Sequence, residues 1–107
     1  MFKTDYCWKI YVPKEVDDKS GKYIAGMCLS YFDGYSKYSV DGGWEGAGKT
    51  YKEPTEVYEV VTGYDTWIQG AIEHIVDFIM KESDEEVVLY TQSPINIFMR
   101  DKNGQSR

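Results

Sequence analysis

The sequence predicts an α+β domain whose elements follow the order β-α-β-β-α-β. A strand-like alternation opens the chain, a long apolar helical stripe occupies its second half, and β-branched segments bounded by turn residues lie between and after them. A chain of 107 residues has room for one hydrophobic core. We therefore expect a single domain over residues 1–99 and a polar tail over residues 100–107.

The first strand is expected from Tyr6 to Val12. Tyr6, Trp8, Ile10 and Val12 recur at every second position, which is the period of a half-buried strand. Pro13 ends the pattern because proline has no amide hydrogen to donate to a neighbouring strand.

A helix is expected next, after a charged linker over Lys14–Lys19. Ser20 is a candidate N-cap, and the helix is predicted to end near Phe32. Glycine lowers helix stability by up to about 1 kcal/mol relative to alanine. Gly26 inside this helix is therefore interpreted as a point of close packing on the sheet. Helical spacing relates Ile24, Met27, Cys28 and Tyr31.

Two strands and a long connection follow. Tyr35–Val40 is predicted to be a strand with Tyr38 and Val40 directed inward. Thr55–Thr62 is predicted to be a central strand because both of its faces carry apolar residues. The glycine-rich segment Asp41–Glu53 between them is expected to be a flexible hairpin connection that joins the two central strands.

The second helix has the clearest pattern in the chain. Asp65 or Thr66 is expected to cap it, and acidic or amide side chains mark its solvent side. Its inner side is one continuous apolar stripe formed by Ile68, Ala71, Ile72, Ile75, Val76 and Ile79.

The last strand is expected over Glu86–Gln92, and the alternating run Ile95–Met99 extends it or forms a short further strand. This order of elements best fits a ferredoxin-like sandwich, in which one antiparallel sheet carries both helices on a single face. Aromatic residues on the other face would be exposed in a monomer. The fold therefore predicts a homodimer or another bound protein partner. The alternative is a Tyr-rich face that is barely covered and tolerates water.

Composition excludes several classes of partner. The formal net charge of −6 disfavours direct binding to nucleic acid or to an anionic membrane, and it suits a basic protein partner. We find no signal peptide and no membrane-spanning run, which predicts a cytoplasmic protein. Cys7 and Cys28 are expected to be free, buried thiols, and with one His they cannot complete a zinc site. No metal or cofactor is predicted.

Gly43–Thr50 matches the phosphate-binding pattern G-x-x-x-x-G-K-[ST] letter for letter. A working P-loop also needs a helix that begins at the Lys-Thr pair, so that backbone amides face the phosphates. Here Thr50 is followed by Pro54 and a strand pattern. The segment is therefore interpreted as a hairpin connection, and Trp44 within it either folds back over the sheet edge or contacts a partner or ligand.

No catalytic set of residues stands out, so the protein is expected to be non-enzymatic. The remaining enzyme hypothesis is a small acid–base catalyst that uses His74, Glu53 or tyrosine hydroxyls. The surplus of Tyr, ten in all, is typical of strand residues, and its other interpretation is a binding surface, because a Tyr ring packs while its hydroxyl reaches a partner. The candidate partner- or ligand-binding residues are Trp44, Glu53, Tyr35, Tyr38, Tyr51, Tyr11 and Lys49.

Short motifs in the segment 41–99 resemble an uncharacterised family of small bacterial domains. The resemblance is carried by Gly43-Trp44, by Glu53-Pro54-Thr55, and by the run from Val88 to Ile97. It implies the same fold and singles out Trp44 and Glu53, without naming a reaction. A looser resemblance, of size and charge, is to small acidic proteins of phages and mobile elements that occupy a host protein's binding site.

The leading hypothesis is a non-enzymatic binding module that engages or blocks a protein partner through its open sheet face or its hairpin. The alternative is a small-molecule or nucleotide-binding domain, in which aromatic rings stack on the ligand and Lys49 meets an anionic group.

Overall fold

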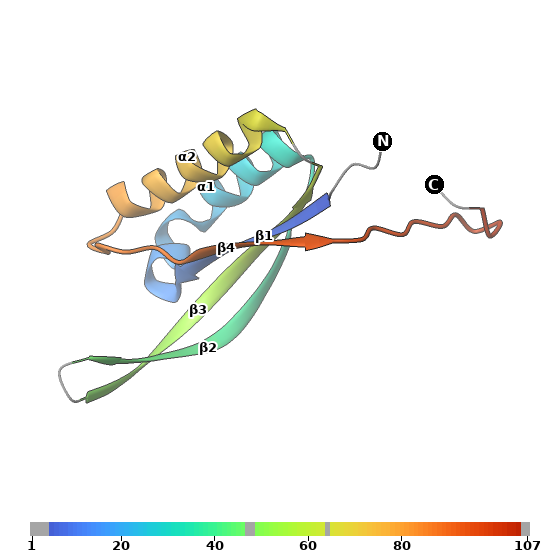
Figure 1. The fold of residues 1–107 in the computed structure, drawn as a ribbon. Coiled ribbons are helices and arrows are strands. Elements are labelled where there is room, and N and C mark those ends of the chain that lie inside the picture. Colours follow the sequence, from blue (N-terminus) through green and yellow to red (C-terminus); the bar gives the residue numbers. More distant parts are fainter. Residues whose placement is uncertain (1–4, 47–48, 64, 106–107) are drawn as a thin grey trace.

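The computed structural model describes residues 5–46, 49–63 and 65–105. It contains one antiparallel sheet of four strands in the order β2-β3-β1-β4, with both helices on the same face (Figure 1). This arrangement confirms the predicted α+β, ferredoxin-like sandwich. The elements are β1 (Asp5–Pro13), α1 (Lys14–Phe32), β2 (Ser36–Gly46), β3 (Lys49–Thr62), α2 (Thr66–Lys81) and β4 (Tyr90–Ile95).

Helix α1 begins earlier than the sequence predicts. The segment Lys14–Lys19 is helical, so the expected charged linker is wrong, and Ser20 is buried inside the helix instead of capping it. Proline favours the start of a helix because its φ angle is already helical and its missing amide hydrogen is not needed there. Pro13 therefore ends β1 and starts α1 at once, and Val16 in the first turn is buried.

Helix α2 agrees with the prediction. Asp65 is its N-cap, and the carboxylate accepts a hydrogen bond from the Trp67 amide at 3.5 Å. All six residues of the predicted apolar stripe are buried: Ile68, Ala71, Ile72, Ile75, Val76 and Ile79. The stripe closes the core against the sheet, where Trp8, Ile10 and Val12 of β1 meet Tyr58 and Val60 of β3. Neither helix of the described residues is long and apolar enough to cross a bilayer.

A tyrosine anchors α1 to the sheet. The ring of Tyr58 is fully buried, and its hydroxyl donates to the Asp17 carboxylate and lies 3.3 Å from the carbonyl oxygen of Gly21. A β-carbon at Gly21 would lie 3.2 Å from that hydroxyl and 2.7 Å from an Asp17 oxygen. Close packing thus falls at Gly21. The expectation for Gly26 is wrong, because nothing lies within 4 Å of a β-carbon there.

Tyr58→Phe is expected to lower the free energy of unfolding by about 1–3 kcal/mol, because the Asp17 carboxylate and the Gly21 carbonyl each lose a hydrogen-bond donor. Urea unfolding followed by circular dichroism measures the change. Tyr23→Phe is the matched control, since Tyr23 is exposed on α1, and it should change the same quantity by less than about 0.5 kcal/mol. Equal effects of the two variants would contradict the anchoring role.

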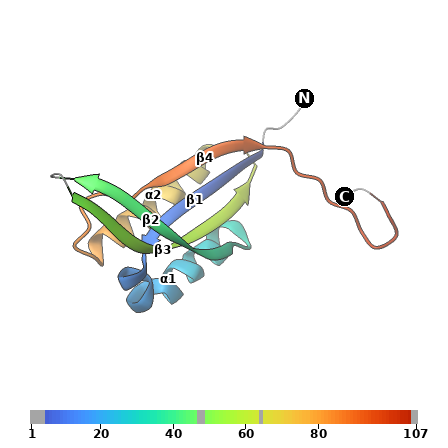
Figure 2. The same cartoon turned by 90° about the horizontal axis from the view of Figure 1, so that it is seen from below.

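The connection between β2 and β3 is mostly strand. The two strands pair continuously from Ser36↔Glu59 to Gly46↔Lys49, so the flexible loop expected over Asp41–Glu53 is wrong. β2 is also an edge strand, so the expectation that the hairpin joins two central strands is wrong as well. Of the two strands of this hairpin, β3 is central as predicted, because it pairs with β2 and with β1. The part of the hairpin formed by residues 41–46 and 49–54 projects beyond the helices, and we call it the arm (Figures 1 and 2).

The last strand is shifted from its expected position. β4 spans Tyr90–Ile95, whereas Glu86–Leu89 is not strand. The shift follows from pairing, because β4 has β1 as its one neighbour and runs alongside it from Ile10↔Tyr90 to Asp5↔Ile95. An edge strand tolerates Pro94 because the side without a neighbour needs no amide donor.

Candidate functional site

The face of the sheet that no helix covers is the open face (Figure 2). Side chains alternate along a strand, so the residues between those of the core lie on this face. In β1 these are Cys7, Lys9 and Tyr11, because Trp8, Ile10 and Val12 enter the core. The register places them beside Val57, Glu59 and Val61 of β3.

One row across the open face is apolar. Tyr38 of β2 is opposite Val57 of β3, Val57 is opposite Tyr11 of β1, and the Tyr11 amide donates to the carbonyl of Leu89 at 3.0 Å. We call these four residues the apolar band. Val57 is 0% exposed although no helix covers it, whereas Leu89 is 58% exposed. The band thus has a sealed centre and an apolar end that is open to solvent.

The expectation that Tyr38 and Val40 point inward is wrong. Val57, the partner of Tyr38, lies on the open face, and Thr55, the partner of Val40, shares the parity of Val57 along β3. The sequence alone could not show this. Alternation defines two faces without telling which face the helices cover.

The next row is polar, with Lys9 opposite Glu59, and one residue from each row beside it contacts this pair. The Cys7 thiol donates to Glu59 Oε1 at 3.0 Å, and Glu59 is opposite Lys9 in the register. Burial and a hydrogen bond to Glu59 raise the pKa of Tyr38, while Tyr38 and Glu59 together raise the pKa of Lys9. We call Cys7, Lys9, Tyr38 and Glu59 the polar cluster. It holds a carboxylate, a cation and two weak acids within one patch.

Cys7 is not poised as a nucleophile. Burial and the hydrogen bond to Glu59 raise the pKa of its thiol to about 11, which keeps it protonated at neutral pH. Cys28 is also free and buried, and burial raises the pKa of its thiol to about 11. The expectation of free, buried thiols is confirmed. The polar cluster therefore presents a neutral thiol beside charged groups, which suits recognition more than covalent chemistry.

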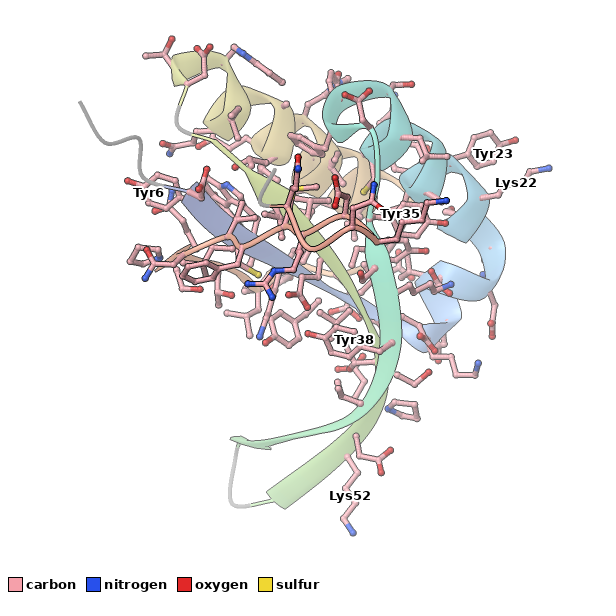
Figure 3. All side chains as sticks on the ribbon, turned by 90° about the vertical axis from the view of Figure 1, so that its right-hand side faces the viewer. Tyr6, Lys22, Tyr23, Tyr35, Tyr38 and Lys52 are labelled. Carbon is pink, nitrogen blue, oxygen red and sulfur yellow. The ribbon has the colours of Figure 1, made fainter. Side chains whose placement is uncertain are left out.

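The predicted binding residues fall into separate regions. Tyr11 and Tyr38 are brought together in the apolar band. Tyr35 lies apart from Tyr38 (Figure 3). Its ring packs on the ring of Tyr58 at a centroid distance of 5.7 Å. Glu53 is half-buried in the arm opposite Gly42, and its carbonyl accepts a hydrogen bond from the Thr55 hydroxyl at 3.0 Å.

The other three predicted residues belong to the outer arm. Trp44 is opposite Tyr51, and Gly46 is opposite Lys49, while the side chains of Trp44, Lys49 and Tyr51 lie outside the described part of the structure. Lys49 and Thr50 begin β3, so the helix that a phosphate-binding loop requires is replaced by a strand. The interpretation of this segment as a hairpin is confirmed.

His74 lies away from both sheet faces. It is exposed on α2, and its Nδ1 contacts the Tyr31 hydroxyl of α1. His74 is not among the described residues that line the pocket beside the start of α2 or the pocket at Phe32–Ser36. Its contact with Tyr31 ties the helices together, and the acid–base hypothesis gains no support from its surroundings.

The residues that sequence reasoning missed are Cys7, Lys9, Glu59 and Leu89. Each lies on a predicted strand or directly beside one. Their contacts, however, depend on pairing between distant segments; Cys7 and Glu59, for example, are 52 positions apart in the sequence. A signal was present in the alternation of Thr55–Thr62, where a lone acidic residue, Glu59, interrupts the apolar residues of one face.

Comparison with known proteins places the fold but not a family. Neither the protein-family models nor the curated protein sequences match this chain. The resemblance to an uncharacterised bacterial family therefore stays a prediction.

Solved structures do share the architecture. One is CutA1 from Oryza sativa, with a TM-score of 0.61 and 16% identity, covering 87% of this chain and 81% of that chain. A second is a phage SAM lyase in complex with S-methyl-5'-thioadenosine, with a TM-score of 0.61 and 12% identity, covering 84% of this chain and 81% of that chain. A third is PII from Arabidopsis thaliana bound to citrate, with a TM-score of 0.56 and 14% identity, covering 97% of this chain and 89% of that chain. The chain thus has the fold of CutA and PII-like proteins, and these likenesses are of fold alone.

Proposed function

We propose that the protein is a binding module that assembles with copies of itself, a homodimer being the smallest such assembly, and that the open face is the surface of assembly. The observation that carries this proposal is the apolar band, whose strand residues lie on a sheet face that lacks a helix and whose last member, Leu89, is exposed beside Tyr11. Exposed apolar surface of this kind is covered when proteins associate. Aromatic residues such as Tyr11 and Tyr38 are enriched among those that contribute most to interfaces.

The polar cluster supports association between identical copies. A two-fold interface brings the same patch of each copy into contact, so residue i of one copy meets residue j of the other, and j meets i. Lys9 and Glu59 are neighbours of opposite charge on the open face. Such a pair is self-complementary, because the Lys9 of each copy can lie against the Glu59 of the other.

The arm supports the proposal independently. β1 ends at Pro13 opposite Thr55, so within the described residues the arm strands pair with each other alone. A hairpin of two strands is marginally stable in water, and its edges carry free backbone donors and acceptors. Contact with another copy would satisfy those groups.

Leu89→Asp is expected to abolish assembly, because burying an unpaired carboxylate in an apolar interface is strongly unfavourable. Size-exclusion chromatography with light scattering, at several protein concentrations, should show the unsubstituted protein as an assembly. The dissociation constant of the variant should rise by at least about tenfold.

Leu29→Asp is the matched control. Leu29 is 53% exposed on α1, compared with 58% for Leu89 on the open face, so the substitution is the same at similar exposure on opposite sides of the molecule. Leu29→Asp should assemble as the unsubstituted protein does. A monomeric unsubstituted protein, or equal weakening by both variants, would refute assembly through the open face.

A different protein is the second candidate partner for the same face. The net charge of −6 favours a basic partner, and a role in blocking such a protein's binding site would follow. This candidate predicts that Leu89→Asp prevents capture of a basic protein from a host lysate, whereas Leu29→Asp does not. A protein that stays monomeric and captures nothing would contradict both candidates.

A further inference from the structure

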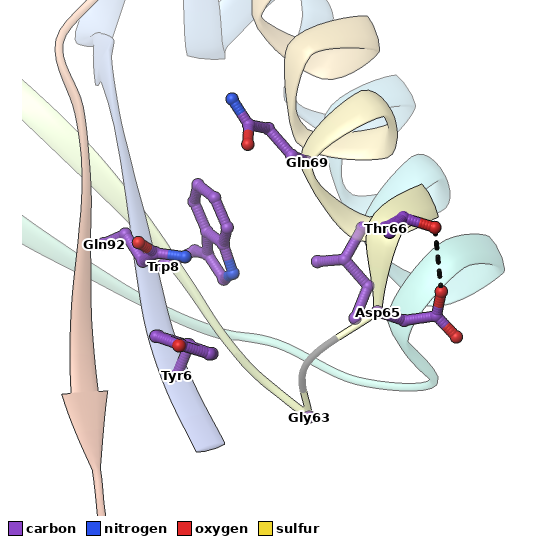
Figure 4. A pocket seen from close by; sticks show the side chains of 8 residues that line it. Tyr6, Trp8, Gly63, Asp65, Thr66, Gln69 and Gln92 are labelled. Atoms are coloured by element: carbon purple, nitrogen blue, oxygen red, sulfur yellow. Dashed lines mark hydrogen bonds between the residues drawn. The ribbon is translucent and has the colours of Figure 1, made fainter. Parts of the chain in front are cut away.

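A pocket of about 170 Å³ lies on the helix side of the sheet, between the start of α2 and the β1–β4 edge (Figure 4). Its walls are formed by Tyr6, Trp8, Gly63, Asp65, Thr66, Ile68, Gln69 and Gln92. Pockets for drug-sized ligands usually enclose about 300–1,000 Å³. This one is smaller, so it suits a single ring system and leaves the rest of a larger ligand outside.

The inner wall is an indole held in one orientation. Trp8 is 6% exposed, and its Nε1 donates to the Thr62 hydroxyl at 3.2 Å. Tyr6 adds a second aromatic ring from the same strand. Stacking of a planar ring on an aromatic side chain is worth about 1–3 kcal/mol per nucleic-acid base, and the small part of Trp8 that is not buried borders this pocket.

Two primary amides enter from opposite sides. Gln92 of β4 is opposite Trp8 in the register, and Gln69 extends from α2 toward the indole (Figure 4). Each amide has a carbonyl acceptor and an NH₂ donor. Gln69 Nε2 already donates to Glu73 at 3.2 Å, and its carbonyl oxygen remains an acceptor. Glutamine amides in this role recognise the mixed donor and acceptor edges of bases such as adenine.

The charge of the pocket argues against an anionic ligand. No Lys, Arg or His is found among the wall residues that the structure describes. The one ionised group is Asp65, whose carboxylate accepts from the Trp67 amide and from the Thr66 hydroxyl at 3.4 Å (Figure 4). The start of α2, which would otherwise attract an anion, is thus already occupied by a carboxylate.

A sugar ring fits less well than a heterocycle. Sugars present hydroxyl donors, and ionised carboxylates are their strongest acceptors. Here one oxygen of the Asp65 carboxylate already accepts from the Trp67 amide and the Thr66 hydroxyl, and the rest of the described wall carries neutral groups and two aromatic rings.

From these contacts we infer that this pocket binds a neutral nitrogen heterocycle of the nucleobase class, free or as a nucleoside, with the ring against Trp8 and its edges on Gln69 and Gln92. The inference does not depend on assembly through the open face, because the pocket lies on the opposite side of the sheet. It also differs from the nucleotide hypothesis built on Lys49, since it needs no phosphate.

The test measures binding of adenine, adenosine, uridine, adenosine monophosphate and glucose by isothermal titration calorimetry, with thermal shift as a second readout. We expect a nucleobase or nucleoside to bind, and the monophosphate to bind more weakly than adenosine because the described wall of the pocket carries no cation. Gln92→Leu and Gln69→Leu should each weaken that binding by about tenfold. Gln105→Leu, at an exposed position near the C-terminus, is the matched control and should leave binding unchanged.

Four results would overturn the inference: no binding of any base or nucleoside, tighter binding of the monophosphate than of adenosine, preference for glucose, or equal affinities of the Gln92→Leu, Gln69→Leu and Gln105→Leu proteins. Leu89→Asp is expected to keep the affinity for the heterocycle. The two proposals can therefore fail separately.

Discussion

Replacing residues 41–54 by Asn-Gly is expected to give a folded protein that no longer assembles. Val40 and Thr55 are directly paired, so two residues can close the hairpin at that point. Asn-Gly suits such a two-residue turn because both positions require positive φ angles. The core lies between the helices and the sheet body, so the shortened chain keeps every buried contact of Ile10, Tyr58 and Ile72.

Light scattering and urea unfolding together measure the outcome. The shortened protein should be monomeric at concentrations where the unsubstituted protein is assembled, and it should still unfold cooperatively. A partial variant that joins Gly43 to Lys52 by the same turn retains half of the arm and serves as the graded control. Full assembly of the shortest version would show that the arm has no part in association. Failure of both versions to fold would show that the arm belongs to the folding unit.

Raising the pH from 8.5 to 11 is expected to lower the free energy of unfolding, and part of that loss comes from ionisation of the Cys28 thiol. Burial raises the pKa of the Cys28 thiol from 9.0 to about 11. A pKa raised on folding means that the folded state favours the neutral thiol. The contribution of the neutral Cys28 thiol to the free energy of unfolding is fully present below pH 9 and is lost as the pH rises toward 11. One pKa unit corresponds to about 1.36 kcal/mol, so the loss at pH 11 reaches about 2 kcal/mol.

Cys28→Ala isolates this contribution. The free energy of unfolding of both proteins is measured in urea at pH 7.5, 8.5, 10 and 11, and the quantity compared is its change with pH. The fall should be shallower in Cys28→Ala by about 2 kcal/mol at pH 11. Cys7 and Tyr58, whose pKa values are also raised, contribute to the fall in both proteins. Parallel curves would mean that the Cys28 thiol ionises as freely in the folded as in the unfolded chain.

The sequence predicted most reliably where one local pattern decided the structure. The sequence of helix α2 predicts an N-cap, an unbroken apolar stripe and a solvent-exposed face, and all three agree with the structure. Helix α1 has a weaker pattern, and its first turn was mistaken for a linker because Lys14, Asp17 and Asp18 are charged. Val16 alone signals the buried side there. Acidic residues in a first turn also stabilise a helix through its dipole, a cue that was available for Glu15 and Asp17.

The candidate site could be predicted only in part, because it is created by pairing between distant strands. Tyr11 and Tyr38 were singled out by residue type, but their common partner Val57 was not. Neither was the cluster around Glu59, which requires the β1–β3 register. The glycines of the arm suggested a loop, since glycine lowers strand propensity. Despite that preference, the two strands of the hairpin remain paired as far as Gly46.

The arm also changes the size of the molecule. A compact chain of this length has a radius of gyration of about 13 Å, whereas the value here is 15.9 Å, with extents of 52 × 26 × 24 Å. The arm projects from one end, and the segment after β4 extends from the other (Figure 1). The protein therefore reaches about twice as far along one axis as across it, and it can contact two surfaces that its core alone could not span.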